Sequence, residues 1–118
     1  MNSILISIKK LLGLDEEYTP FDTDLIIHIN TFLGVLNQLG VGVTNFKITG
    51  ATETWADFLS GSDPGLLDEC KTYVYIRTKL VFDPPSSSIV TQALKETMNE
   101  LEWRLNIKTE AAERAAES

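Results

Sequence analysis

Hydrophobic side chains recur along most of this chain every three to four residues, the spacing of one face of a helix. The first such segment covers residues 3–12, where Ser3 is suited to cap the helix start and Gly13 to follow its end. Its apolar positions are Ile4, Leu5, Ile8, Leu11 and Leu12. An acidic linker, "LDEEYTP", follows it.

Residues 23–39 show the clearest helical pattern of the chain. Asp22 precedes them as a candidate N-cap, and Gly40 follows as a candidate end. The apolar stripe comprises Leu25, Ile29, Phe32, Leu36 and Leu39, widened by Ile26, Leu33 and Val35. Such a wide stripe predicts a central helix that contacts more than one neighbour.

Residues 40–64 interrupt the helical pattern. Early glycines and alternating apolar residues predict a loop with a short extended piece, but one isolated strand would leave its backbone unpaired, so no sheet is expected. From Thr52, two helical turns are predicted with Trp55, Phe58 and Leu59 on one side. Asp63 and Pro64 then fit the cap and first position of another helix.

Two longer helices are predicted in the second half, over residues 65–82 and about 87–107. The first places Leu66, Cys70, Tyr73, Val74, Leu80 and Val81 on its main apolar face, and the second has an inner seam of Val90, Leu94, Met98, Leu101 and Leu105. Between them, Asp83, Pro84, Pro85 and Ser86 form a hard break, because proline disfavours helix at the preceding residue. Ser86 or Ser87 is suited to cap the new helix.

These elements predict an all-α protein, a small bundle of about four to five helices with one irregular loop excursion at about residues 40–64. We expect one helical domain over residues 1–108 and a flexible C-terminal tail over residues 109–118. The tail is rich in alanine and glutamate but has no large apolar residue to anchor it, so we expect it to fray when the protein is free.

Composition agrees with one globular domain. The chain has 118 residues, of which 43% are hydrophobic and 23% charged. Its formal net charge of −7 disfavours a nucleic-acid binder that neutralises phosphates. A single cysteine excludes an internal disulfide. With no apolar run long enough to span a membrane and no signal peptide, we expect a soluble, cytosolic chain when it is made.

Catalytic chemistry finds little support in the sequence. His28 lies four residues after Asp24, but a surface pair on one helix face explains this spacing better than an oriented base does. Cys70 lies on an apolar helix face and fits a small core residue better than a nucleophile. No metal-ligand spacing or phosphate-binding glycine loop is present. We therefore expect no enzyme activity and no cofactor, and we expect both residues to be dispensable for function.

Aromatic residues on second helix faces are the most informative feature. Trp103 lies off the inner seam, in line with Glu96, Glu100 and Ile107. Tyr75 and Phe82 lie seven residues apart with Lys79 between them, away from the main face of their helix. Either the excursion over residues 40–64 covers these aromatics or they form a subunit interface. We favour the interface, because an exposed tryptophan patch is typical of binding hot spots.

Five segments, in this order, resemble a known family. They are "ILISIKKLLGL", "FDTDLIIHIN", "LNQLGVG", "VYIRTKLVFDPP" and "NELEWRLN". Their order and spacing are similar to those of the small helical head-tail connector proteins, also called adaptor or head-completion proteins, of long-tailed double-stranded DNA phages and prophages. The resemblance covers residues 4 to about 108 and implies a helical bundle with a loop excursion.

The resemblance also implies a structural role and a set of partners. Copies would form a ring under the portal protein, extend the DNA channel and offer a platform to the next connector or tail-completion protein. Genomic DNA would pass without sequence-specific binding, and no membrane would be involved. The protein would reside at the head-tail interface of the virion, after assembly in the host cytoplasm.

Each subunit of such a ring presents two different surfaces to its neighbours. The candidate interface residues are Trp103, Ile107, Tyr75, Lys79 and Phe82. In the resembling family the C-terminal segment docks on the portal, which makes Lys108, Glu110, Glu113, Arg114 and Glu117 candidate docking residues. The break at residues 83–86 would set the angle between the long helices, and thereby the closure of the ring.

Two other functions stay open at this stage. The chain could be a small acidic helical binding or regulatory protein of phage origin that acts on a host factor. Its acids are interleaved with lysine and arginine, as in "KTYVYIRTK", which argues against a mimic of the DNA phosphates. A small enzyme is the third alternative, without a supporting constellation of residues.

Overall fold

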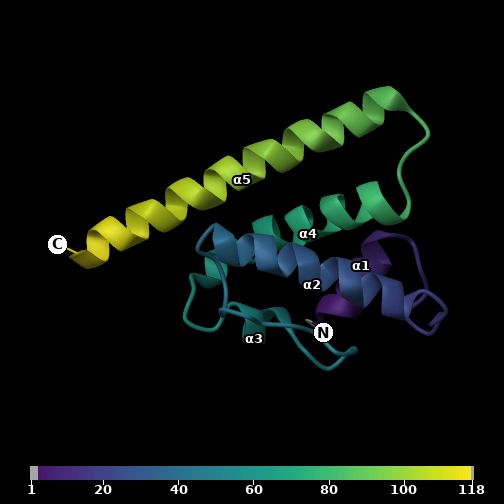
Figure 1. The fold of residues 1–118 in the computed structure, drawn as a ribbon, viewed down its shortest axis with the longest axis horizontal. Coiled ribbons are helices and arrows are strands. Elements are labelled where there is room, and N and C mark those ends of the chain that lie inside the picture. The colour runs from purple at the N-terminus through teal and green to yellow at the C-terminus, as the bar shows by residue number, and fades with distance from the viewer. Residues whose placement is uncertain (1–2, 118) are drawn as a thin grey trace.

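The protein consists of helices joined by loops, as seen in a computed structural model that describes residues 3–117, with side chains through Glu110. In chain order the elements are α1 (Ile4–Leu11), α2 (Asp22–Gln38), α3 (Trp55–Phe58), the short 3-10 helix η1 (Pro64–Leu66), α4 (Leu67–Phe82) and α5 (Ser88–Glu117). The β pairing within these residues is one isolated bridge between Ser3 and Thr54. The predicted all-α bundle is confirmed (Figure 1).

Helix α4 is the centre of the bundle. It packs against α1 and α2 on one side and against α5 on the other (Figure 1). Helix α2 contacts both α1 and α4, so the prediction that its wide stripe serves more than one neighbour is confirmed. Fully buried core side chains come from all of these elements and include Ile4, Ile8, Leu25, Ile29, Leu33, Leu36, Trp55, Phe58, Tyr73, Val74 and Leu105. Each such side chain stabilises the fold by about 1.5–3 kcal/mol.

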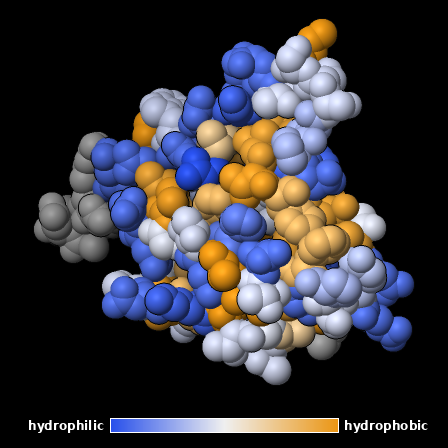
Figure 2. Space-filling view, turned by 45° about the vertical axis from the view of Figure 1, so that its right-hand side comes forward, coloured by the Kyte–Doolittle hydropathy of each residue, from blue (hydrophilic) through white to orange (hydrophobic). Residues whose placement is uncertain are grey.

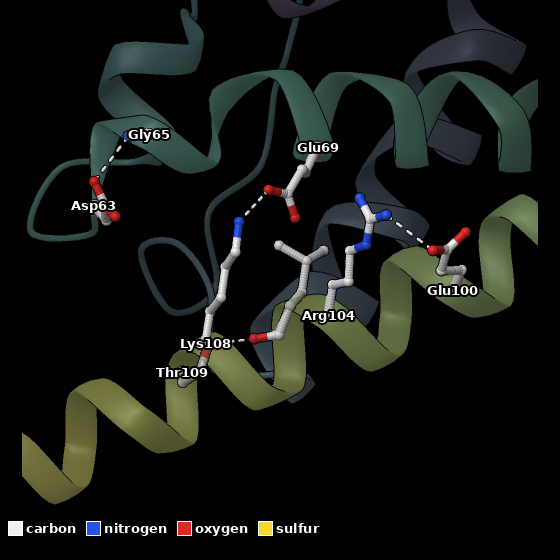
Figure 3. A network of polar contacts seen from close by, with 8 residues as sticks. Asp63, Gly65, Glu69, Glu100, Arg104, Lys108 and Thr109 are labelled. Carbon is white, nitrogen blue, oxygen red and sulfur yellow. Dashed lines mark hydrogen bonds and ion pairs between the residues drawn. The ribbon is translucent and has the colours of Figure 1, made fainter.

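Most helix ends lie where the sequence predicts them. The Ser3 hydroxyl accepts a hydrogen bond from the Ile6 N–H, and the Asp63 carboxylate accepts one from Gly65 at 2.8 Å, ahead of the proline that begins η1 (Figure 3). Gly40 follows α2 with a φ of +91°, a conformation in which glycine is not strained.

The predicted cap of α2 is wrong. Asp22 is the first residue of the helix, and the capping position belongs to Phe21, which makes no side-chain cap. The Asp22 carboxylate instead lies 2.9 Å from the ammonium of Lys9 on α1, without the geometry of a hydrogen bond. Lys9 is only 1% exposed, and it also donates a hydrogen bond to the Glu16 carbonyl at 2.9 Å. This buried lysine ties α1, the linker and α2 together.

The excursion over residues 40–64 is a folded loop that covers α1 and α2. Its helix α3 is shorter than predicted, because it begins at Trp55 behind a reciprocal cap between Thr54 and Asp57. The Asn30 side chain of α2 holds the loop by accepting from the Ile48 N–H at 2.7 Å and donating to the Ile48 carbonyl at 3.0 Å. Gly42 has a φ of +85°, and a Cβ there would lie 2.2 Å from the Phe58 ring.

Three residues assigned to buried faces are exposed instead. Leu11, Val81 and Val90 are 49%, 53% and 47% exposed. Leu11 ends the short first helix, while Val81 and Val90 flank the break between α4 and α5. The last helix is also longer than predicted, since it continues beyond residue 107 to Glu117.

Helices α4 and α5 diverge toward the break that joins them. On α5, Leu101 and Leu105 are buried, Leu94 and Met98 are half-buried, and Ile89 is 81% exposed. Figure 1 shows the same opening, with the two helices farther apart near their connection than near the middle of α5. Helix α4 ends at Phe82, and Ser87 caps α5 by accepting from the Val90 N–H at 3.4 Å.

Candidate interaction surface

The outer face of α5, which points away from α4, carries the most exposed tryptophan of the chain. Trp103 is 65% exposed and Ile107 is 43% exposed, so the excursion over residues 40–64 does not cover them. Glu96 and Glu100 lie on the same face and are also exposed. We call these four residues the α5 ridge. A largely exposed aromatic ring gains only a small part of the free energy that full burial would provide.

Polar contacts hold the inner side of α5 on α4. The Tyr73 hydroxyl donates to Glu102 at 2.7 Å, and the Arg77 guanidinium lies 3.7 Å from the same carboxylate. Burial raises the pKa of the Tyr73 phenol, and its hydrogen bond to Glu102 acts in the same direction. Farther along, Lys108 forms an ion pair with Glu69 on α4 (Figure 3). The ridge is therefore presented on a helix whose opposite side is firmly anchored.

Where α4 and α5 diverge, a groove of about 350 Å³ remains between them. We call it the α4/α5 groove, and it is lined by Phe32, Arg77, Leu80, Val81, Lys95, Met98 and Asn99. The Arg77 guanidinium lies 4.9 Å from the centre of the Phe32 ring, so its charge sits over an aromatic wall. Figure 2 shows hydrophobic residues gathered across the centre of the face turned toward this end of the molecule, among hydrophilic ones.

The groove was not predicted from the sequence. Val81 was assigned to a buried face, and Arg77 and Lys95 were not singled out. The available signal was Arg77 itself, a charged residue between the apolar pairs Tyr73-Val74 and Leu80-Val81 of one helix. Helical periodicity assigns residues to faces but does not reveal that two paired helices diverge.

The candidate residues of α4 are less exposed than Trp103. Phe82 is half-buried and meets the ring of Phe21 edge-on at 5.2 Å, so the linker before α2 covers it. Tyr75 is half-buried against the core. The Lys79 ammonium pairs with Asp83 at 3.4 Å, across the end of α4. Among the described side chains, no hydrogen bond, ion pair or ring contact joins these three residues to Trp103.

The break and the tail lie at opposite ends of α5. Asp83, Pro84 and Ser86 are exposed and Pro85 is half-buried, in an irregular segment between the helices. Of the candidate docking residues, Lys108 is paired with Glu69, and Glu110 lies on α5. Glu113, Arg114 and Glu117 lie outside the residues whose side chains the structure describes.

Both residues weighed for catalysis occupy packing positions. The His28 ring stacks on Phe32 at 6.5 Å, and Cys70 is fully buried. Burial, with a smaller effect of the neighbouring Glu69, raises the pKa of the Cys70 thiol to about 12. The thiolate is therefore scarce at neutral pH. Among the described residues, no group of three or more histidine, cysteine or acidic side chains is placed to hold a metal ion.

Comparison with known proteins identifies a family. A family model described as phage connector protein matches residues 4–112, from the first residue of α1 into the last turns of α5. Neither the curated proteins nor the solved structures contain a match to this chain. In the part of the chain that the structure describes, every helix is too short or too polar to cross a membrane.

Proposed function

Since this chain belongs to the phage connector protein family, we propose that it is a structural subunit of the head-tail connector that forms a ring beneath the portal protein. The ring extends the DNA channel and provides a platform for the next connector or tail-completion protein. The protein resides at the head-tail interface of the virion. Its role is mechanical and needs no cofactor.

The observation that supports this proposal best is the exposure of Trp103. The indole of Trp103 is 65% exposed on a helix that is well packed elsewhere, and Ile107 lies one turn away on the same face. Burying an aromatic side chain of roughly 200 Å² at a subunit interface gains up to about 5 kcal/mol by area. A monomer has no use for this arrangement, whereas a ring subunit requires apolar surface outside its own core.

The charge of the chain is also compatible with a channel for DNA. A formal net charge of −7 does not favour tight binding to phosphates, so a genome would slide through without being held. The acids alternate with basic residues over much of the chain, which favours specific pairs with protein partners over a single acidic face.

The test is native mass spectrometry of the purified portal mixed with this protein. We expect a stoichiometric complex that contains several copies per portal ring and that is lost with Trp103→Ala. Ile27→Ala serves as the matched control, because Ile27 is 58% exposed on α2, away from the ridge. A protein that stays monomeric and ignores the portal would refute the connector role.

A further inference from the structure

The α5 ridge and the α4/α5 groove are complementary in shape and charge. The ridge presents a large aromatic ring and an aliphatic side chain beside two carboxylates. The groove offers an apolar pocket of about 350 Å³ whose lining includes two cationic side chains, Arg77 and Lys95. Lys95 forms no ion pair with any described residue, so its charge is available to a partner.

We propose that Trp103 of one copy inserts into the α4/α5 groove of a second copy, which makes this pair of surfaces the contact between neighbouring subunits. This inference rests on the ring proposed above and names the surfaces that build it. The indole would lie against Leu80, Val81 and Met98, with the Arg77 guanidinium near its ring. Arg77 already lies close to two aromatic rings, at 4.9 Å from Phe32 and 5.7 Å from Tyr73, and a guanidinium attracts the face of an aromatic ring.

Charge decides in favour of a second copy as the occupant. Glu96 and Glu100 lie about two turns and one turn before Trp103 on the ridge. When Trp103 enters the groove, these carboxylates come close to the cationic lining. Arg104 lies 2.9 Å from Glu100 within the same helix, so Glu96 is the stronger candidate to pair with Lys95. Opposite charges at the rim mainly set the register and speed of association.

A single copy is unable to make this contact with itself. Trp103 follows Met98 by five residues, which places the two side chains about 140° apart around α5. Met98 faces the groove, so Trp103 points away from it. Contact between two different surfaces of identical chains is heterologous, and it closes into a ring when the rotation per subunit permits.

Disulfide trapping tests this geometry even when association is weak. One full-length variant keeps Trp103 and carries Ile107→Cys, one turn away on the ridge, together with Val81→Cys, and a control carries Ile107→Cys together with Ile27→Cys. Val81 and Ile27 have matched exposures of 53% and 58%, and the native Cys70 is fully buried. After mild oxidation at high protein concentration, with and without portal, we expect the Val81 variant to form a ladder of cross-linked chains several-fold more abundant than in the control.

A mixing experiment tests the same contact without cysteines. Trp103→Ala destroys the ridge, and Val81→Glu blocks the groove by placing a carboxylate at an exposed position that folding tolerates. Each variant alone should be monomeric, whereas the mixture should give one-to-one dimers that do not extend, because one intact ridge meets one intact groove. If no dimers form, either in the mixture or in the single samples, the pairing is contradicted.

Failure of this inference is distinguishable from failure of the connector role. Rings or portal complexes whose Val81 variant cross-links no better than the control would overturn the pairing and leave the connector role intact. Protection of a lone Val81→Cys thiol from maleimide labelling by portal, without cross-links between copies, would show that the portal fills the groove. Dimers from Ile107→Cys alone would show that two ridges face each other. Monomers in every sample, with and without portal, would overturn both proposals.

Discussion

The two tryptophans of this chain have opposite environments. Trp55 is fully buried between α3 and the core, whereas Trp103 is 65% exposed on α5. Lys9 and Lys10 are adjacent and differ in the same way, because Lys9 is 1% exposed and Lys10 is exposed. These pairs allow the contribution of a position to be separated from the contribution of the residue type.

We expect Trp103→Ala to abolish assembly and to leave the fold intact. The free energy of unfolding should change by no more than about 0.5 kcal/mol, because the ring makes few contacts within its own chain. Trp55→Ala is the matched control and should cost about 3–5 kcal/mol, as truncation of a buried tryptophan does. Chemical denaturation and native mass spectrometry measure the two properties. A large loss of stability in Trp103→Ala would assign that residue to the core.

Lys9 should be essential for stability in spite of its charge. Lys9→Ala removes a buried stem and leaves the Glu16 carbonyl and the Asp22 carboxylate without their cation, at a cost of about 3–5 kcal/mol. Lys9→Met retains the apolar stem and should lose less. Lys10→Ala should stay within about 0.5 kcal/mol of the original protein. Urea unfolding measures the series, and an equal effect of Lys9→Ala and Lys10→Ala would exclude the buried pair as a stabilising contact.

At the scale of elements, the connection between α4 and α5 has the largest consequence. Asp83 adopts φ −145° and ψ 67° after the last turn of α4, which turns the chain out of the helix before the two prolines. The helices then diverge and open the α4/α5 groove. The break therefore separates two helices and also determines how far apart they stand at their joined ends.

Replacing both prolines, Pro84→Ala with Pro85→Ala, should alter assembly more than folding. Alanine permits helical conformations that proline forbids, so the angle between α4 and α5 becomes less defined. We expect mixed or open assemblies by electron microscopy instead of uniform rings. Ser86→Ala, in the same exposed segment, is the control and should leave assembly unchanged. Uniform rings from the double variant would refute a role of the break in ring closure.

At the scale of the whole molecule, α5 dominates the shape. Its 30 residues span about 45 Å, close to the longest extent of the molecule, 49 Å. The middle of α5 rests on α4, while its first turns form one wall of the groove. Lys108 and Thr109 still contact the body. Lys108 forms an ion pair with Glu69, and the Thr109 side chain lies against Gly40. These two residues therefore contact the body at the start of the predicted tail, within a helix that continues to Glu117.

Truncation should separate portal docking from stability. Ending the chain after Glu110 keeps the contacts of Lys108 and Thr109, so the melting temperature should not change while portal affinity falls. Ending it after Ile107 also removes the ion pair with Glu69, which should cost up to about 1 kcal/mol because the pair is partly exposed. Calorimetry and portal binding assays measure both variants. Equal portal affinity of the full-length and the Glu110 variant would show that docking uses the helical body alone.

Local signals in the sequence were sufficient for most of the architecture. Helical periodicity, the cap at Ser3, the Asp63-Pro64 start and the glycine after α2 predict the elements and most of their ends, because these features depend on residues close in the chain. The same periodicity placed Trp103 off the packed seam of its helix. The resemblance of five sequence segments, in their order and spacing, also predicted the family that the comparison found.

Contacts between distant segments decided the rest. Asp22 is a residue type that commonly caps helices, but its carboxylate pairs with Lys9 of another helix. A pattern of neighbouring residues does not reveal this long-range contact. Val81 and Val90 have the right spacing for burial and are exposed, because the helices that carry them diverge. Phe82 is half-buried because the ring of Phe21, which lies far away in the sequence, packs against it. A periodic pattern determines which residues share a face, whereas only the packing of whole helices determines what each face meets.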